Sequence, residues 1–146
     1  DCGWDYHSNG NSPKNMAGLY PMGHQVDHAV AAFLTDLERR GLSDKVLLVV
    51  TGEMGRTPRL NKNGGRDHYG NLTSLLLAGG GLKMGQVVGE SDSTASLPAT
   101  RPYGPMNLFG TIFHTLFDMG ELRIAQNLPA PIRELADKAR PIPELV

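Results

Sequence analysis

The chain has 146 residues, which is enough for one domain with a hydrophobic core but short for two. With 40% hydrophobic and 20% charged residues, it belongs to neither the fibrous nor the disordered classes. Its formal net charge of −1 gives no electrostatic attraction to nucleic acid or to an anionic membrane. No apolar run in the sequence is long enough to span a bilayer. Cys2 is the only cysteine, so no internal disulfide and no cysteine-based zinc site is expected.

The first part of the chain predicts a loop, a helix and a buried strand. Residues 1–22 are rich in Gly, Asn, Ser and Pro, which indicates a long loop of the kind that carries function. Apolar residues then recur at helical spacing over 23–40, and Gly41 stands where a helix would end. The unbroken apolar run at 45–51 is typical of a strand buried on both faces of a parallel sheet.

The second part predicts further strands and helices separated by loops. A polar loop at 52–71 leads to a second apolar strand at 72–78, which the glycines at 79–81 close in a tight turn. The remaining elements are a short strand at 86–89, a polar loop at 90–104, a helix from Pro105 to Gly120 and a short helix near 131–139. This order of helices and strands favours an α/β fold.

Two polar loops collect residue types that bind metals. In the first loop, Asp5 and His7 offer oxygen and nitrogen ligands to one borderline cation. The second loop begins with Glu53 at the end of the buried strand, where α/β sheets place their ligand crevices. It continues to Asp67 and His68, which are also ligand types.

Arginines in the second loop add an anion-binding element. Arg56, Arg59 and Arg66 lie between Glu53 and His68, and guanidinium groups hold tetrahedral oxyanions through a planar fork of donors. Together with the carboxylates and histidines, they predict a metal-assisted site for a phosphate or sulfate ester.

The motifs resemble those of a bacterial family known as domain of unknown function fifteen-oh-one, over residues 3 to about 120. They are Gly-Trp-Asp-Tyr-His at 3–7, the helix end at 34–42, Gly-Glu-Met-Gly-Arg-Thr-Pro at 52–58, Gly-Arg-Asp-His-Tyr at 65–69 and Ala-Gly-Gly-Gly-Leu-Lys-Met-Gly at 78–85. That family is similar to the alkaline phosphatase and sulfatase superfamily, whose members hydrolyse phosphate or sulfate esters with one or two metals.

The resemblance implies a fold and a location. It implies that residues 1–146 are a single partial domain, the C-terminal half of an alkaline-phosphatase-like α/β/α sandwich with a mostly parallel sheet. The N-terminal half, which carries the nucleophile in that superfamily, is expected to be absent from this chain. The chain alone is therefore not expected to hydrolyse a substrate. A periplasmic or secreted location is also implied.

The resemblance further implies a divalent cation (zinc, calcium, magnesium or manganese) and an anionic ester of a small molecule or glycan. The implied metal ligands are Asp5, His7, Glu53, Asp67 and His68, with Asp67 either a ligand or an orienting group. The implied substrate-binding residues are Arg56, Arg66 and Asn9. One cation is expected rather than two, because Met54 stands where a His or Asn ligand occurs in the superfamily and a thioether binds these metals poorly.

Several alternatives stay open. The chain could be a non-catalytic member that binds an anionic glycan or a protein partner, or a structural module with solvated loops. Glu53, Asp67 and His68 could form an ion-pair network with the arginines. Two further groups are expected to be solvated helix faces: His24, Asp27 and His28 in the first helix, and His114 in a later one.

Overall fold

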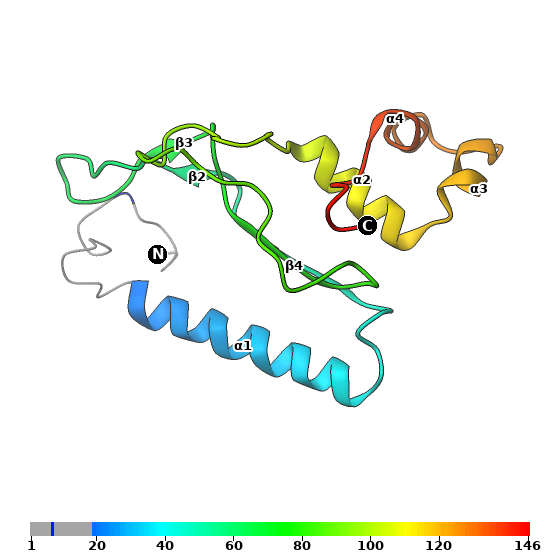
Figure 1. Ribbon diagram of the computed structural model, residues 1–146, viewed down its shortest axis with the longest axis horizontal. Coiled ribbons are helices and arrows are strands. Elements are labelled where there is room, and N and C mark those ends of the chain that lie inside the picture. Colours follow the sequence, from blue (N-terminus) through cyan, green and yellow to red (C-terminus); the bar gives the residue numbers. More distant parts are fainter. Residues whose placement is uncertain (1–6, 8–18) are drawn as a thin grey trace.

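The computed structural model describes residue 7 and residues 19–146 (Figure 1). The elements in chain order are α1 (Leu19–Arg39), β1 (Leu47–Thr51), β2 (Gly55–Arg56), β3 (His68–Tyr69), β4 (Leu75–Gly79), α2 (Pro105–Leu116), α3 (Met119–Ile124) and α4 (Ala130–Lys138). In Figure 1, α1 runs along one side of the molecule, β2 and β3 lie at one end, and α2, α3 and α4 gather at the other. The chain therefore combines helices with small sheets. Over the described residues, no helix is both long and apolar enough to cross a membrane.

The strands β1 and β4 form a two-stranded antiparallel sheet, in which Leu47 lies opposite Gly79 and Thr51 opposite Leu75. Both strands were predicted from their apolar runs, but the runs also predicted burial on both faces of a parallel sheet. The structure differs because no helix connects the two strands: the chain makes β2 and β3 and then returns beside β1. Parallel pairing needs a crossover, whereas a direct return suits antiparallel pairing. Within the described ranges, neither a parallel sheet nor a three-layer sandwich is seen.

The helix α1 ends where the sequence predicts. The N–H of Gly41 donates to the carbonyl of Glu38 at 3.0 Å, and the N–H of Leu42 donates to that of Leu37 at 2.9 Å. Gly41 has φ of +66°, which is the left-handed conformation that closes helices in this hydrogen-bonding pattern. The start differs from the prediction, because the helix begins at Leu19 rather than at Gly23.

The C-terminal helices correct one prediction and confirm another. The helix predicted from Pro105 to Gly120 is two helices, because Asp118 accepts hydrogen bonds from the N–H groups of Gly120 and Glu121 and so begins α3. The short helix near 131–139 is confirmed as α4.

The segment after β4 also differs in part from the prediction. Gly79, Gly80 and Gly81 all have positive φ, which confirms the tight turn. The strand predicted at 86–89 is wrong: this segment is irregular, and the Gln86 side chain donates to the carbonyl of Glu144 at 2.8 Å.

The C-terminal segment joins the sheet to α2. Leu82, Ile142 and Leu145 form the buried core here, and the partly buried hydrophobic side chains packed on them are Leu47, Leu77, Val88, Tyr103 and Val146. The hydroxyl of Thr111, which is fully buried, accepts from the N–H of Ile142 at 3.0 Å. Gly110 lets the chain pass close by, because a Cβ there would lie 2.4 Å from the carbonyl carbon of Arg140.

Candidate functional site

A short ribbon of β2 and β3 sets the backbone of the candidate site. Arg56 pairs with His68, and Gly55 pairs with Tyr69. A Cβ added to Gly55 would lie 1.6 Å from the carbonyl oxygen of Leu72, so only glycine lets the chain after β3 pass this close. The ribbon therefore holds Arg56 and His68 on adjacent strands.

The guanidinium of Arg56 lies at the centre of the site. Its Nη1 is 2.9 Å from Nε2 of His7 and 3.4 Å from the carbonyl oxygen of Arg66, and its Nη2 is 3.9 Å from Oε1 of Glu53. Because a guanidinium offers only N–H donors, a hydrogen bond between these two groups has the ring nitrogen of His7 as its acceptor. The Arg56 side chain is 23% exposed and that of Glu53 is 69% exposed, so the ion pair between them is loose and solvated.

Two imidazole rings meet beside Arg56. The ring centroids of His7 and His68 are 4.6 Å apart, with their planes tilted by 54°. The tertiary structure thus brings four of the residues predicted from the sequence together: His7, Glu53, Arg56 and His68.

Asp67 and Arg66, by contrast, hold the loop that follows β2. The Asn61 amide donates both to Oδ1 of Asp67 at 2.8 Å and to the carbonyl oxygen of His7 at 3.2 Å. The Arg66 guanidinium donates to the carbonyl oxygens of Thr57 at 2.7 Å and Pro58 at 2.6 Å. These contacts fix the backbone around Arg56 and His7.

Sequence reasoning missed Asn61. Its Oδ1 accepts from the N–H groups of Asn63 and Gly65, which makes a side-chain-capped turn. The segment Asn-Lys-Asn-Gly-Gly at 61–65 carries the residue types of such a turn, so a turn at Asn61 could have been predicted. Its contact with His7 could not, because 54 residues separate the two.

An open hollow of about 840 Å³ adjoins these groups. It reaches from the two histidines to the C-terminal end of β1, the start of β4 and one residue of α1. Its lining residues are His7, Val26, Val50, Thr51, Gly52, Glu53, Met54, Arg56, His68, Ser74, Leu75 and Leu76. Met54 therefore contributes to the wall of the hollow.

The family described as "Protein of unknown function (DUF1501)" matches the chain over residues 1–146. The chain belongs to DUF1501. No curated protein and no solved structure matches it. The family resemblance of the motifs is thus confirmed, and two of the DUF1501 motifs, Gly-Glu-Met-Gly-Arg-Thr-Pro and Gly-Arg-Asp-His-Tyr, supply the β2–β3 ribbon and the residues around it.

The predicted metal ligands of this DUF1501 chain come together only in part. Asp5 and Asn9 lie outside the described residues. Over residue 7 and residues 19–146, no group of three or more His, Cys, Asp or Glu side chains is arranged to hold a cation. The rings of His7 and His68 lie next to each other, and Glu53 lies 3.9 Å from Nη2 of Arg56.

Histidines elsewhere in the DUF1501 chain lie apart from this site. His24, Asp27 and His28 are exposed on α1, and His114 is exposed on α2. Because α1 begins at Leu19, Asp27 does not lie in the first turn, where the helix dipole would favour it. The Tyr20 ring stacks near that of His24, with their centroids 6.4 Å apart.

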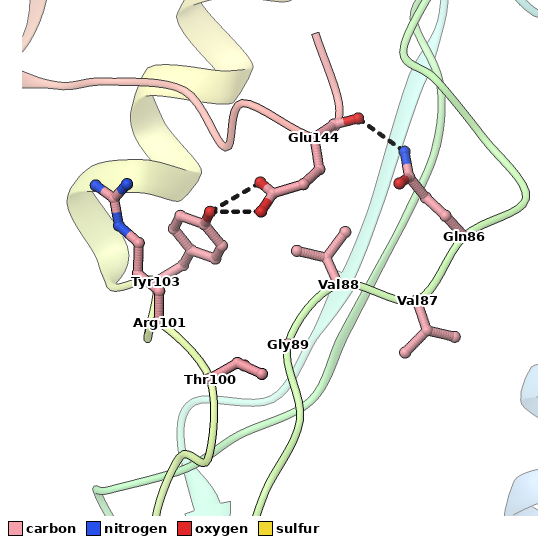
Figure 2. A pocket seen from close by; sticks show the side chains of 8 residues that line it. All are labelled: Gln86, Val87, Val88, Gly89, Thr100, Arg101, Tyr103 and Glu144. Atoms are coloured by element: carbon pink, nitrogen blue, oxygen red, sulfur yellow. Dashed lines mark hydrogen bonds between the residues drawn. The ribbon is translucent and has the colours of Figure 1, made fainter.

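A second hollow, of about 220 Å³, lies where the C-terminal segment meets residues 86–103 (Figure 2). The Tyr103 hydroxyl donates to the Glu144 carboxylate at 2.8 Å, and this hydrogen bond raises the pKa of Tyr103. The Arg101 guanidinium carbon lies 5.7 Å from the centre of the same ring. Figure 2 shows Tyr103, Glu144 and Gln86 joined by these hydrogen bonds, so the polar groups of this hollow tie the chain segments together.

Proposed function

We propose that this DUF1501 chain is part of a metal-dependent hydrolase-like domain that acts on phosphate or sulfate esters. The observation that supports the proposal is the meeting of His7, His68, Arg56 and Glu53 at one end of an open hollow. Imidazoles bind divalent cations, and guanidinium groups hold tetrahedral oxyanions. The resemblance to the alkaline phosphatase and sulfatase superfamily implies the same chemistry and, for the complete domain, a mostly parallel sheet in an α/β/α sandwich.

The proposed metal ligands are His7, His68 and Glu53, together with Asp5. They hold one cation rather than two, and zinc, calcium, magnesium and manganese are all candidates. Asp67 is proposed as an orienting group, because its carboxylate accepts from Asn61, which also holds the carbonyl of His7.

Two arginines of the chain have different proposed roles toward the substrate. Arg56 binds the non-bridging oxygens of the ester, and Arg66 keeps the loop beside it in place through Thr57 and Pro58. A bound cation supplies a Lewis acid that stabilises charge on those oxygens. The nucleophile is not assigned to any residue of this chain.

One observation favours a second candidate, a non-catalytic domain that binds an anionic glycan or an acidic protein. Nη1 of the Arg56 guanidinium lies 2.9 Å from Nε2 of His7. A fixed positive charge so close to a ligand nitrogen disfavours a cation there and favours an anion.

Metal content and anion binding of the same variants separate the two candidates. After equilibration with zinc, manganese, calcium or magnesium and removal of free metal, elemental analysis should find metal in the wild type and in His114→Ala, whose histidine is exposed on α2. His68→Ala should lose it. Retention of metal by His68→Ala at the wild-type level would exclude the proposed ligand set.

Hydrolysis of generic phosphate and sulfate esters, with each metal added, tests the activity itself. If the wild type binds no metal but binds sulfate, and Arg56→Gln abolishes that binding, the non-catalytic candidate is correct. His114→Ala is again the matched control, because it should change neither measurement.

A further inference from the structure

We infer that the ligand of this site has an apolar group next to its anionic head, as an alkyl or aryl phosphate or sulfate has, and is not a wholly polar sugar ester. This inference rests on the proposed function, because it names the substrate class of the same site. It follows from the two unlike parts of the hollow's lining.

The described lining residues of the hollow include a charged and imidazole group at one end and an apolar group, with Thr51, Gly52 and Ser74 completing the lining. The charged and imidazole groups are those of His7, Glu53, Arg56 and His68. The apolar lining comes from three separate elements and the loop after β1, and consists of Val26, Val50, Met54, Leu75 and Leu76. The volume of about 840 Å³ lies in the range of small-molecule sites and far exceeds what one inorganic anion fills.

Two of the apolar lining residues, Val50 and Leu76, share one face of the β1–β4 sheet. Val50 and Leu76 lie directly opposite each other in the β1–β4 pair, so their side chains stand next to each other on the same face of the sheet. Leu75 and Leu76 are 39% and 42% exposed, although both lie in a strand. An apolar group laid against Val50 and Leu76 would remove apolar surface from water, which is favourable.

Among the described residues outside the charged end, the side chains of the lining that can hydrogen-bond a ligand are those of Thr51 and Ser74. The Thr51 hydroxyl, which lines this part, already donates to the carbonyl of Gly52 at 2.9 Å. Sugar hydroxyls set against Val50 and Leu76 would lose water without gaining hydrogen bonds from these side chains, which is costly. The lining therefore selects against a wholly polar ester.

The charged end can receive the head group of such a ligand. Glu53 is mostly exposed and stands 3.9 Å from Arg56, so an anion can displace it at little cost. His68 is exposed on the neighbouring strand, within reach of the same anion. The apolar group would then extend along β1 and β4.

Titration calorimetry of the full chain with inorganic phosphate and with methyl, propyl, butyl and hexyl phosphate tests this inference. Affinity should rise by up to about fourfold for each added methylene, until the apolar part is filled. Glucose 6-phosphate should bind no more tightly than methyl phosphate.

Variants locate the apolar group. Leu76→Ser and Val26→Thr should each reduce the gain per methylene, and Val26→Thr conserves side-chain volume on an exposed helix, so it keeps the test valid if Leu76→Ser does not fold. Leu97→Ser is the matched control, because Leu97 is an exposed leucine outside the hollow. An equal loss in Leu97→Ser would overturn the inference.

The same series distinguishes failure of the inference from failure of the proposed function. If phosphate binds through Arg56, as loss of binding in Arg56→Gln would show, but chain length has no effect, the inference is wrong and the proposed function stands. If no phosphate of any kind binds, with or without divalent metal, both are wrong.

Discussion

Nη1 of Arg56 lies 2.9 Å from Nε2 of His7, although 49 residues separate the two in sequence. The whole of α1 and the strand β1 lie between them in the chain. This contact joins the last residue of the first motif, Gly-Trp-Asp-Tyr-His at 3–7, to the β2–β3 ribbon. Changes that disturb the ribbon should therefore disturb His7 as well, even though it lies far away in sequence.

Gly55→Ala should disrupt the candidate site. The new Cβ would lie 1.6 Å from the carbonyl oxygen of Leu72, so β2 must move away from the chain that follows β3. We expect a loss of about 1–3 kcal/mol in the free energy of unfolding, measured by urea denaturation, and shifted imidazole resonances of His7 and His68.

Gly70→Ala is the control for this change, because a Cβ at Gly70 meets no atom within 4 Å. It should alter stability by less than about 0.5 kcal/mol and leave the imidazole resonances in place. Equal effects of the two substitutions would mean that the close approach at Gly55 is not what holds the ribbon.

Thr111→Val should loosen the C-terminal segment. The substitution removes the hydroxyl that accepts from the N–H of Ile142 in a fully buried position, and it leaves that N–H without its partner. The expected cost is about 1–3 kcal/mol in the free energy of unfolding, with faster hydrogen exchange at the Ile142 amide. Thr35→Val, at an exposed hydroxyl that bonds only within α1, should cost less than about 0.5 kcal/mol. Slow exchange at Ile142 in Thr111→Val would contradict the assigned role.

The loop at 90–98 should be sensitive to acid through Asp92. Its Oδ1 accepts from the N–H groups of Ser96 at 2.8 Å and Thr94 at 3.1 Å, and chiefly the Ser96 bond lowers the pKa of Asp92. A pKa that is lower in the folded than in the unfolded chain means that this stabilisation is present above the unfolded value of about 3.9. It is lost as the pH falls through the folded pKa.

An NMR pH titration of the Thr94 and Ser96 amides measures this directly. The midpoint should fall below about pH 3.9 in the wild type, and the transition should vanish in Asp92→Asn. Because the Tyr69 hydroxyl donates to the carbonyl of Ser96 at 2.6 Å, the Tyr69 ring should report the same transition. A midpoint at or above the unfolded value would refute the hydrogen-bonded arrangement.

Two glycines around α1 should respond to alanine with opposite signs. A Cβ meets no atom within 4 Å at either Gly23 or Gly41, so backbone conformation alone decides. Gly23 lies inside α1, where alanine should stabilise the protein by roughly 0.5–1 kcal/mol. Gly41 has φ of +66°, where alanine should destabilise it by roughly 1–2 kcal/mol. Thermal unfolding of both variants measures the difference, and equal signs would be inconsistent with the helix end at Arg39.

The sequence by itself determined the elements that depend on neighbouring residues. Apolar spacing predicted α1, and unbroken apolar runs predicted the two strands. Gly41 marked a helix end because glycine adopts positive φ without strain. The break between α2 and α3 was also predictable, since Asp118 and Glu121 have the spacing of a helix start, but the prediction of a single helix did not use this signal. The order of the motifs indicated the family.

Only the tertiary structure decided how these elements meet. An apolar run does not specify the direction of its partner strand, so the antiparallel pairing of β1 and β4 depends on where the chain returns after β3. In the same way, sequence spacing could not predict that Asn61 is the hydrogen-bond partner of Asp67, or that Arg56 contacts His7. These contacts form only when separate segments of the chain fold against the β2–β3 ribbon. Residue type is a local property, whereas the partner of a polar side chain is set by the approach of other segments.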